Sequence, residues 1–453
     1  MRTDAKKRAQ VAVEQSREVA RVVRAVERAS GVDLEAVELA LRQALLREGV
    51  CVLETLLESV GVGRREQAVR CRCGTPMRSV GVRTKQVQTL LGNVRFARSR
   101  YRCPECGKTR CPGDEELGIE RTSRSPGVQR QVARLGSKEP FREVARDLQE
   151  LAGIRLSRKD AERVSERIGA EMEQWQERER MALRFTEPPP PEAPKTIETL
   201  YVEFDGTGVP MVPNELAGRK GKQPDGSAKT REAKLGCVFT QTAFDNEGRP
   251  IRDSGTTSFV GAIENAQTFG ERIFAEAVRR GLYQAKRVVV LGDGAEWVKN
   301  QAGIHFGLAQ YIIDFYHASE HVTDLCRALF DRDLKRLNRY RDRWLDALED
   351  GAIETIVDQA REFLPKDPKS GKDARTQIGY FEKNKEYMRY ARFKAEGYFI
   401  GSGVIEAGCK TVIGQRLKQS GMEWTVRGAN AIIALRCATL SRRAEEFWEQ
   451  RAG

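Results

Sequence analysis

Two aspartates in this 453-residue sequence each follow a strand-like apolar run and stand beside glycine. Asp293 comes directly after the run VVVLG at 288–292, and Asp205 lies within LYVEFDGTG at 200–208. A short apolar run that stops at glycine is typical of a buried strand, and ligands of open α/β sheets gather at the carboxyl edge of such strands. The adjacent glycines let a metal ion or a phosphate approach the backbone. The simpler alternative is that each aspartate caps the turn that follows it.

A third acid, Glu406, lies among small and apolar residues in YFIGSGVIEAGCK at 398–410. An acid in such surroundings needs a partner or a function, and Lys410, one helical turn later, is the simple ion-pair candidate. Together, Asp205, Asp293 and Glu406 offer the hard oxygen ligands that Mg²⁺ or Mn²⁺ prefers. Two such ions can activate a water or a 3′ hydroxyl for in-line attack at phosphorus, so no covalent nucleophile is required.

The elements that must position these acids form a mixed α/β pattern. Strands are expected at 199–205, 235–243, 255–260, around Val288 and at 310–315, with one helix near 265–280. This order predicts a mixed sheet. A charged, helical stretch then separates Asp293 from Glu406 and has the pattern of an insertion. The sequence therefore predicts a sheet domain at 198–317 and 398–453, interrupted by a helical insertion at 318–397.

Other side chains near the predicted sheet edge are candidates for support of the site. The stretch 314–317 reads Asp-Phe-Tyr-His, and His317 and His321 would share one helix face, although a structural placement of both is the simpler interpretation. Trp297 could stack on an unpaired base, but an aromatic residue early in a helix more often packs in the core. Glu203 and Glu296 rank below the three chosen acids.

The segment 61–115 is rich in cysteine and in positive charge. Cys71 and Cys73 precede a predicted hairpin at 86–91 and 94–101, and Cys103-Pro-Glu-Cys106 follows it with metal-ligand spacing. Four thiolates would close a tetrahedral Zn²⁺ site, and a basic hairpin has too little apolar surface to fold without one. The first pair is one residue shorter than the common spacing, so Cys111 remains a substitute ligand.

The charge of the chain indicates a polyanionic partner. The formal net charge is +13, and between Gly61 and Pro112 there are 13 Lys and Arg against 2 acids, a local excess of 13 − 2 = 11. This concentration favours nucleic acid over a merely solvated face. The ten cysteines do not form the dense pattern of a small secreted protein, and no membrane-spanning run is present, so a cytoplasmic location without membrane contact is expected.

Helices are expected on both sides of the basic segment. Residues 1–60 show helical periodicity and no sign of chemistry. Residues 126–185 contain one helix at 141–151, a turn at Gly153 and a second helix opened by a Ser157 to Asp160 capping box, which is the pattern of a helix-turn-helix. A proline-rich linker at 186–197 follows. The candidate DNA contacts on the second helix are Arg158, Lys159 and Arg163; Arg416, downstream of Glu406, is a further candidate.

The motifs taken together resemble the DDE transposases of bacterial insertion sequences. DGTG around Asp205, LGDGAEW around Asp293, DFYH at 314–317 and GSGVIEAGCK around Glu406 occur in the same order, and the pattern is most similar to the Kra-type family, which is related to the Mutator-like group. The resemblance spans 199–448, and the cysteine-rich segment is also similar to that family's zinc-binding region. The short Cys71 to Cys73 pair departs from the usual spacing.

The resemblance implies an RNase H-like catalytic core with an all-helical insertion, preceded by helical and zinc-ribbon DNA-binding segments. It implies that Asp205, Asp293 and Glu406 bind the catalytic metal, and that Asp314 and His317 lie near the scissile DNA. The implied substrates are terminal inverted repeats and target DNA of a mobile element in the bacterial nucleoid. Because two ends must meet, a homo-oligomer is expected.

Two other functions fit parts of the pattern. A haloacid-dehalogenase-like phosphotransferase would use Asp205 as covalent nucleophile, but its second acid would fall on Thr207, and about 160 residues follow the supposed last motif. A noncatalytic zinc-ribbon DNA-binding protein would keep the cysteines and the basic segment without turnover.

Overall fold

The computed structural model describes residues 17–28, 31, 33–60, 63–65, 67–185, 197–221, 223–365 and 371–452 of the protein. Apart from single C-terminal residues, the chain divides into two compact units, Met1–Val164 and Ser165–Arg451. The boundary falls inside the long helix α7 (Arg158–Phe185), whose residues from Ser165 onward, the larger part of the helix, belong to the second unit. The proline-rich linker expected at 186–197 lies, except for its last residue, outside the described part of the chain.

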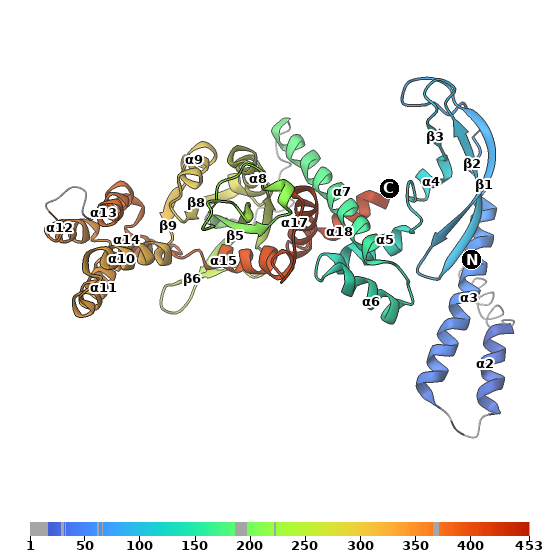
Figure 1. The fold of residues 1–453 in the computed structure, drawn as a ribbon, viewed down its shortest axis with the longest axis horizontal. Helices are drawn as coiled ribbons and strands as arrows, with labels where there is room; N and C mark the ends of the chain where they lie inside the picture. Colours follow the sequence, from blue (N-terminus) through green and yellow to red (C-terminus); the bar gives the residue numbers. More distant parts are fainter. Residues whose placement is uncertain are drawn as a thin grey trace. The chain divides into compact units, whose positions relative to one another are not determined.

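The first unit combines a helical hairpin with an antiparallel sheet (Figure 1). β1 and β2 pair along their length, with a register shift between Ser79 and Val82, and the short β3 extends the sheet beside β2. The sheet packs on α3 through a small core. The expected hairpin is confirmed and begins earlier than predicted. The elements are α2 (Arg17–Glu27), α3 (Leu34–Val60), β1 (Arg78–Gln88), β2 (Asn93–Arg102), β3 (Thr109–Arg110) and α4 (Pro112–Glu116).

Three helices complete the first unit, and their ends follow from local chemistry. α5 (Pro126–Gly136) begins at Ser125, whose side chain accepts from the Val128 amide. α6 (Phe141–Ala152) ends at Gly153, whose φ of 69° suits glycine at a helix C-terminus. The Asp160 amide donates to the Ser157 hydroxyl at 3.0 Å, so the expected cap opens α7; the Asp160 carboxylate accepts from the same hydroxyl at 3.1 Å rather than from the Ser157 amide, as a full capping box requires.

The second unit is built on a mixed sheet with strand order β6-β5-β4-β8-β9, and β7 also pairs with β5. β4 lies between an antiparallel neighbour, β5, and a parallel neighbour, β8, which in turn pairs parallel with β9. The strands are β4 (Ile197–Pro210), β5 (Thr230–Phe244), β6 (Pro250–Arg252), β7 (Ser258–Ala262), β8 (Ala285–Gly292) and β9 (Gln310–Ile313).

Helices cover both faces of this sheet (Figure 1). Leu200, Val202 and Phe204 of β4 share a buried cluster with α8 and α9, whereas the alternate residues face the segment that follows residue 398. The covering helices are α8 (Ala266–Arg279), α9 (Glu296–His305), α15 (Gly403–Gly408), a π-helical turn at Cys409–Gly414, α16 (Gln415–Leu417), α17 (Val426–Leu440) and α18 (Ala444–Ala452).

Between β9 and residue 398 the described chain is helical, as the expected insertion requires. Trp344 and Phe381 are fully buried within this helical layer, and the Tyr390 hydroxyl donates to the Ile313 carbonyl at 3.0 Å, which ties the insertion to β9. The helices are α10 (Phe315–Phe330), α11 (Leu334–Glu349), α12 (Ile353–Glu362), α13 (Lys372–Asn384) and α14 (Tyr390–Ala395). No helix among the described residues is both long and apolar enough to cross a membrane.

Candidate active site and candidate metal centre

The register between β4 and β8 relates the two candidate aspartates. The parallel ladder ends with Glu203 opposite Leu291, and Asp205 and Asp293 each follow two residues after this last pair. Neighbouring strands are about 4.8 Å apart. Asp205 was expected at the end of a strand, and this detail is wrong: β4 continues to Pro210, paired with β5 alone. Asp205 lies instead where the pairing with β8 stops.

Asp293 makes the turn contact that the capping interpretation predicts, whereas Asp205 lies within β4 and caps no turn; both remain partly exposed. One oxygen of Asp205 accepts from the Gly206 amide at 2.6 Å, and one oxygen of Asp293 accepts from the Ala295 amide at 2.9 Å. Burial raises the pKa of Asp205, the Cys409 thiol and the Gly206 amide oppose this shift, and the charge of Asp293 adds to it. The two carboxylates are therefore close enough to influence each other.

Glu406 lies in the first turn of α15, where its side chain is exposed. The helix then widens into the π turn at Cys409–Gly414, a feature that is frequent at functional sites. The Arg436 guanidinium donates to the carbonyls of Thr411 and Val412, which stabilises this turn. Within the described residues, no ion pair joins Glu406 to Lys410, so the simple ion-pair interpretation of Glu406 does not hold in this structure.

The three candidate acids do not form a closed ligand group in this structure. Among the described residues, the only set of three or more potential ligands whose atoms all lie within 4.8 Å of one another is a group of four cysteines. Asp205 and Asp293 both follow the last pair of the β4–β8 ladder, and the thiol of Cys409, one turn after Glu406, opposes the rise that burial causes in the pKa of Asp205, so it lies near this carboxyl group. A shared metal site of the three acids remains a prediction.

Asp314 joins two elements of the site. It is 1% exposed, and its two oxygens accept from the amides of His317 and Ser402. It therefore caps α10 and also holds the loop that leads into α15. His317 is exposed on the first turn of α10.

The structure also locates the three remaining candidates of this unit. Trp297 packs on Phe204 and Phe269, and the ammonium of Lys234 lies 5.1 Å from the centre of its ring, as the core interpretation predicts. Lys410 is exposed on the π-helical turn that follows α15. Arg416 was expected to contact DNA, and this expectation is wrong. Its side chain is fully buried, with its guanidinium 5.0 Å from the centre of the Trp424 ring, so it is not a surface contact for DNA.

Glu203, ranked low from the sequence, is the buried acid beneath the site. Its carboxylate accepts from the Ile405 amide at 2.8 Å, which fixes the start of α15 beside Glu406. Burial raises its pKa to about 8, the Ile405 amide opposes this shift, and the charge of Asp314 adds to it. The period of two along β4, which places residues 201, 203 and 205 on one face, could have identified it.

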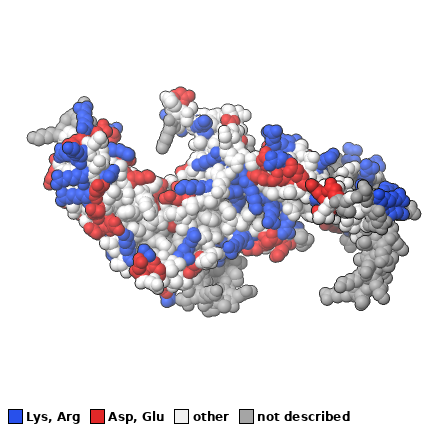
Figure 2. All heavy atoms as spheres, turned by 90° about the horizontal axis from the view of Figure 1, so that it is seen from below, with Lys and Arg blue, Asp and Glu red and all other residues white. Residues whose placement is uncertain are grey.

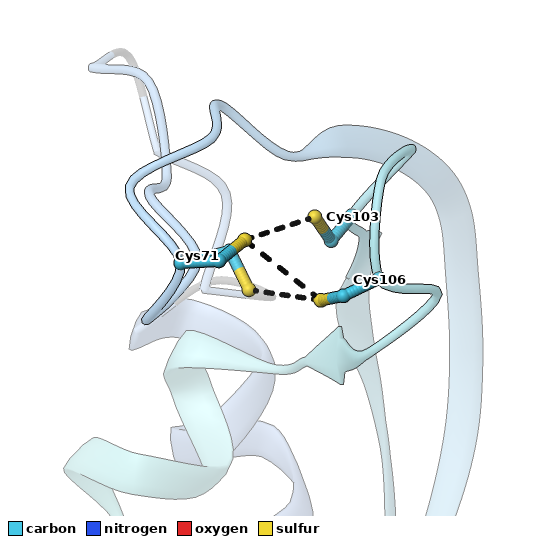
Figure 3. A group of neighbouring side chains, drawn as sticks. Cys71, Cys103 and Cys106 are labelled. Atoms are coloured by element: carbon cyan, nitrogen blue, oxygen red, sulfur yellow. Dashed lines mark hydrogen bonds between the residues drawn. The ribbon is translucent and has the colours of Figure 1, made fainter.

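Four cysteines of the first unit, Cys71, Cys73, Cys103 and Cys106, form one cluster (Figure 3). Their sulfur atoms all lie within 4.8 Å of one another. Cys71, before β1, points toward Cys103 and Cys106, which flank the turn after β2. The sulfur separations are 3.5 Å for Cys71 and Cys106, 3.6 Å for Cys73 and Cys103, and 3.9 Å for Cys73 and Cys106. Four thiolates at about 2.3 Å from a zinc ion lie about 3.8 Å apart. The donor set and spacing therefore fit Zn²⁺.

Cys111 is not a member of this cluster, although the sequence left it as a substitute ligand. The backbone and hydroxyl of Thr75 lower the pKa of Cys73 to about 6, which favours the thiolate that a metal requires. The pKa of Cys111 is raised by burial, but that of Cys106 is raised too, to about 11, with the backbone of Lys108 opposing the neighbouring thiols, so the ligand assignment depends on geometry. The shorter Cys71 to Cys73 spacing is thus compatible with all four ligands.

The remaining DNA-contact candidates lie on the first turns of α7, and all three side chains are exposed. Lys159 pairs with Glu162 at 2.7 Å, whereas no ion pair of Arg158 or Arg163 is present within the described chain. Their accessibility is compatible with phosphate contacts but does not establish them.

Zinc binding predicts a clear difference between two cysteine variants. Cys103→Ser should lose the zinc ion and unfold the region around the hairpin, because a metal that binds only the folded state contributes folding free energy. Cys111→Ser should keep the metal. Elemental analysis of the purified full chain and circular dichroism check both. Zinc loss in Cys111→Ser, with retention in Cys103→Ser, would reverse the ligand assignment.

Asp314 is expected to contribute to the free energy of unfolding, independently of any role in chemistry. Asp314→Ala removes a helix cap and leaves the Ser402 amide without its acceptor, a cost of about 2 to 4 kcal/mol. Asp314→Asn keeps one side-chain acceptor oxygen and should cost less. Urea unfolding of the full chain, followed by tryptophan fluorescence, measures both. Equal stability of Asp314→Ala and the parent would contradict the proposed clamp.

Glu203 should make stability fall as pH rises. Its folded pKa of about 8 lies above its ordinary value of 4.5, so the folded state binds more protons between these values. Its stabilising contribution is complete below pH 4.5 and is lost as pH approaches 8. Glu203→Gln cannot titrate, and each pKa unit corresponds to about 1.4 kcal/mol. In EDTA, the thermal midpoint of Glu203→Gln minus that of the parent should therefore increase from pH 5 to pH 8. A difference that does not change with pH would exclude this role.

Comparisons with known proteins cover different parts of the chain. Residues 274–451 match the model of an uncharacterised protein family (UPF0236), a region that includes Asp293 and Glu406 but not Asp205 and is less than half of the chain. No curated protein matches the sequence.

One solved structure similar to this chain is the Drosophila P element transposase strand transfer complex, with 9% sequence identity over 74% of this chain and 96% of that chain, at a TM-score of 0.32. A TM-score below 0.5 does not establish a shared fold, so this similarity decides nothing about the protein. Over residues 274–451, the chain is thus similar to a family whose own function is uncharacterised.

Proposed function

We propose that the protein is a DDE transposase that cleaves and transfers insertion-sequence DNA ends with Mg²⁺ or Mn²⁺. The observation that carries the proposal is the register of β4 and β8: Asp205 and Asp293 each follow two residues after the last pair of this ladder, Glu203 and Leu291. The hydrogen bond between Glu203 and the Ile405 amide brings the start of α15, and with it Glu406, to the adjacent part of the same strand.

The surrounding architecture supports the same proposal. A mixed sheet with helices on both faces and a helical insertion between the second and third acids is compatible with the RNase H-like core that the motif resemblance implies. The four motifs, at Asp205, Asp293, 314–317 and Glu406, belong to one unit of the chain. Membership of one unit is what a shared site of these motifs would require.

The donor set fits divalent ions of the magnesium type. Asp205 and Asp293 each use one oxygen to accept from a nearby backbone amide, and Glu406 is exposed without an ion pair among the described residues, so carboxylate oxygens remain for a ligand. When bound, such ions supply an activated water or 3′ hydroxyl and stabilise the leaving oxygen. The three acids would hold them.

Other residues of the chain would orient the acids and the DNA. Asp314 holds the loop before α15 through the Ser402 amide, and so restricts where Glu406 can lie. Lys418 donates to the Thr207 hydroxyl, two residues after Asp205, which brings a positive charge to the edge of the site. A cation there would attract a DNA phosphate and position it without reading its sequence.

The first unit would supply much of the DNA affinity. Arg78, Arg83 and Arg95 on β1 and β2 are exposed, and α7 adds the exposed side chains of Arg158 and Arg163. Figure 2 shows that Lys and Arg are interspersed with Asp and Glu on the face it draws, so no single-sign field covers that face. In contrast to that mixed face, the sequence between Gly61 and Pro112 has a local excess of 11 positive charges. This excess favours the segment as the main phosphate contact.

The test compares the parent with three acid variants on duplex DNA that carries the element's ends. Asp205→Ala, Asp293→Ala and Glu406→Ala should each reduce divalent-ion-dependent cleavage and strand transfer to background, because each removes a metal ligand. All three should bind the duplex as the parent does in a gel-shift assay. Asp342→Ala is the matched control, since this exposed acid of α11 pairs with the neighbouring Arg341 and should be dispensable.

The alternatives give different outcomes in the same experiment. Hydrolysis of a phosphomonoester that requires Asp205 and Asp293 but not Glu406 would favour the phosphotransferase. Tight duplex binding without any cleavage by the parent, in Mg²⁺ and in Mn²⁺, would favour the noncatalytic DNA-binding protein.

A further inference from the structure

The helical insertion brings one side chain against the Asp293 turn. Tyr380, on α13, has its hydroxyl oxygen 3.1 Å from the position that a Cβ atom would occupy on Gly294. Gly294 has a φ of 81°, so glycine suits this turn on conformational grounds as well. The insertion therefore reaches the residue next to a candidate metal ligand.

The Tyr380 hydroxyl is buried and has no hydrogen-bond partner within the described part of the chain. An unpaired buried hydroxyl costs about 1 to 3 kcal/mol, and phenylalanine in the same position would avoid this cost. Such a group calls for an explanation, and a partner acquired only in another state of the molecule is one.

Several contacts fix Tyr380 in this position. Its ring stacks on His321 with the ring centres 3.7 Å apart, and His321 is held in turn by Gln377 at 2.7 Å. The Lys383 ammonium pairs with Glu296 of α9 at 2.9 Å, so α13 is attached to the helix that begins after the Asp293 turn. Small movements of α9 or α13 would change the distance between the hydroxyl and Asp293.

The charges around the hydroxyl favour a hydrogen-bond donor. Burial raises the pKa of Tyr380, and the negative charges of Asp293 and Asp314 raise it further, so the phenol stays protonated. One oxygen of Asp293 is used by the Ala295 amide, and its other oxygen has no partner among the described residues. A buried donor and an open acceptor thus lie at the same turn.

We propose that Tyr380 is a positioning residue of the active site, whose hydroxyl donates to the second side of the Asp293 carboxylate when a divalent ion and DNA are bound. This inference rests on the proposed function and adds to it a role for the insertion. Carboxylates that bind metals are themselves oriented by hydrogen bonds, and loss of such a contact typically lowers metal affinity or activity 10- to 100-fold. Docking of α13 would therefore be a condition for a competent site.

The test is Tyr380→Phe in the full chain, with Tyr340→Phe as matched control. Tyr340 belongs to the same insertion but packs with Phe330 and Phe363. Tyr380→Phe should weaken Mn²⁺ binding about 10- to 100-fold, measured by electron paramagnetic resonance of free Mn²⁺ with end DNA present, and should slow cleavage similarly. Its metal-free thermal midpoint should equal or exceed that of the parent, because an unpaired hydroxyl is removed. Tyr340→Phe should bind Mn²⁺ as the parent does.

Two outcomes would overturn the inference. In one, Tyr380→Phe binds Mn²⁺ as tightly as the parent; in the other, weaker binding is accompanied by a lower metal-free midpoint, which marks a purely structural role. The Mn²⁺ titration does not require cleavage. A parent that binds the ion but does not cut DNA would therefore overturn the proposed function, whereas the role of Tyr380 would still be tested by comparing the Mn²⁺ affinities of the parent and Tyr380→Phe.

Discussion

The backbone hydrogen bonds between β4 and β8 are the constraint on which the candidate site depends. A parallel ladder permits only one register at a time, and a slip by one residue would turn Asp205 toward the face occupied by Val202 and Phe204. That apolar face is buried under α8 and α9, so burial of its side chains selects the register that brings the two aspartates together. Burial of the apolar side chains therefore also determines the positions of the two aspartates.

The opposite face of β4 shows how the third acid is linked to the first two. Glu203 is fully buried and bonds to the α15 backbone, and Asp314 bonds to the loop just before it. Both contacts join backbone amides near Glu406 to carboxylates that have little access to water. Such contacts are stronger than those at the surface, because water does not compete for them.

Local patterns predicted the elements but not their contacts. The glycine-bounded run before Asp293, the hairpin between the cysteine pairs and the capping box at Ser157 depend on neighbouring residues, and the structure confirms the strand, the hairpin and the cap. The continuation of β4 past Asp205 depends on β5, which begins 25 residues later. No local pattern records such a distant partner.

Burial explains the other departures from the sequence prediction. Arg416 follows Glu406 at a spacing that suits a charged helix face, yet its guanidinium lies under the surface beside Trp424. Long arginine side chains pack well on aromatic rings, so charge alone does not indicate exposure. Conversely, Tyr380 is separated from Asp293 by most of the insertion, and nothing in its own neighbourhood of the sequence connects the two.

The widened turn at Cys409–Gly414 has a geometric consequence for the residues on either side of it. A π turn accommodates an additional residue, and each residue of an α-helix contributes a rotation of about 100°. The azimuth of Lys418 about the helix axis, relative to that of Glu406, is therefore set by this one irregularity. Relaxation to a regular α-helix would swing the lysine away from Thr207 while leaving the acid in place. The orientation of this lysine relative to the acid is thus set by a helical irregularity rather than by either side chain.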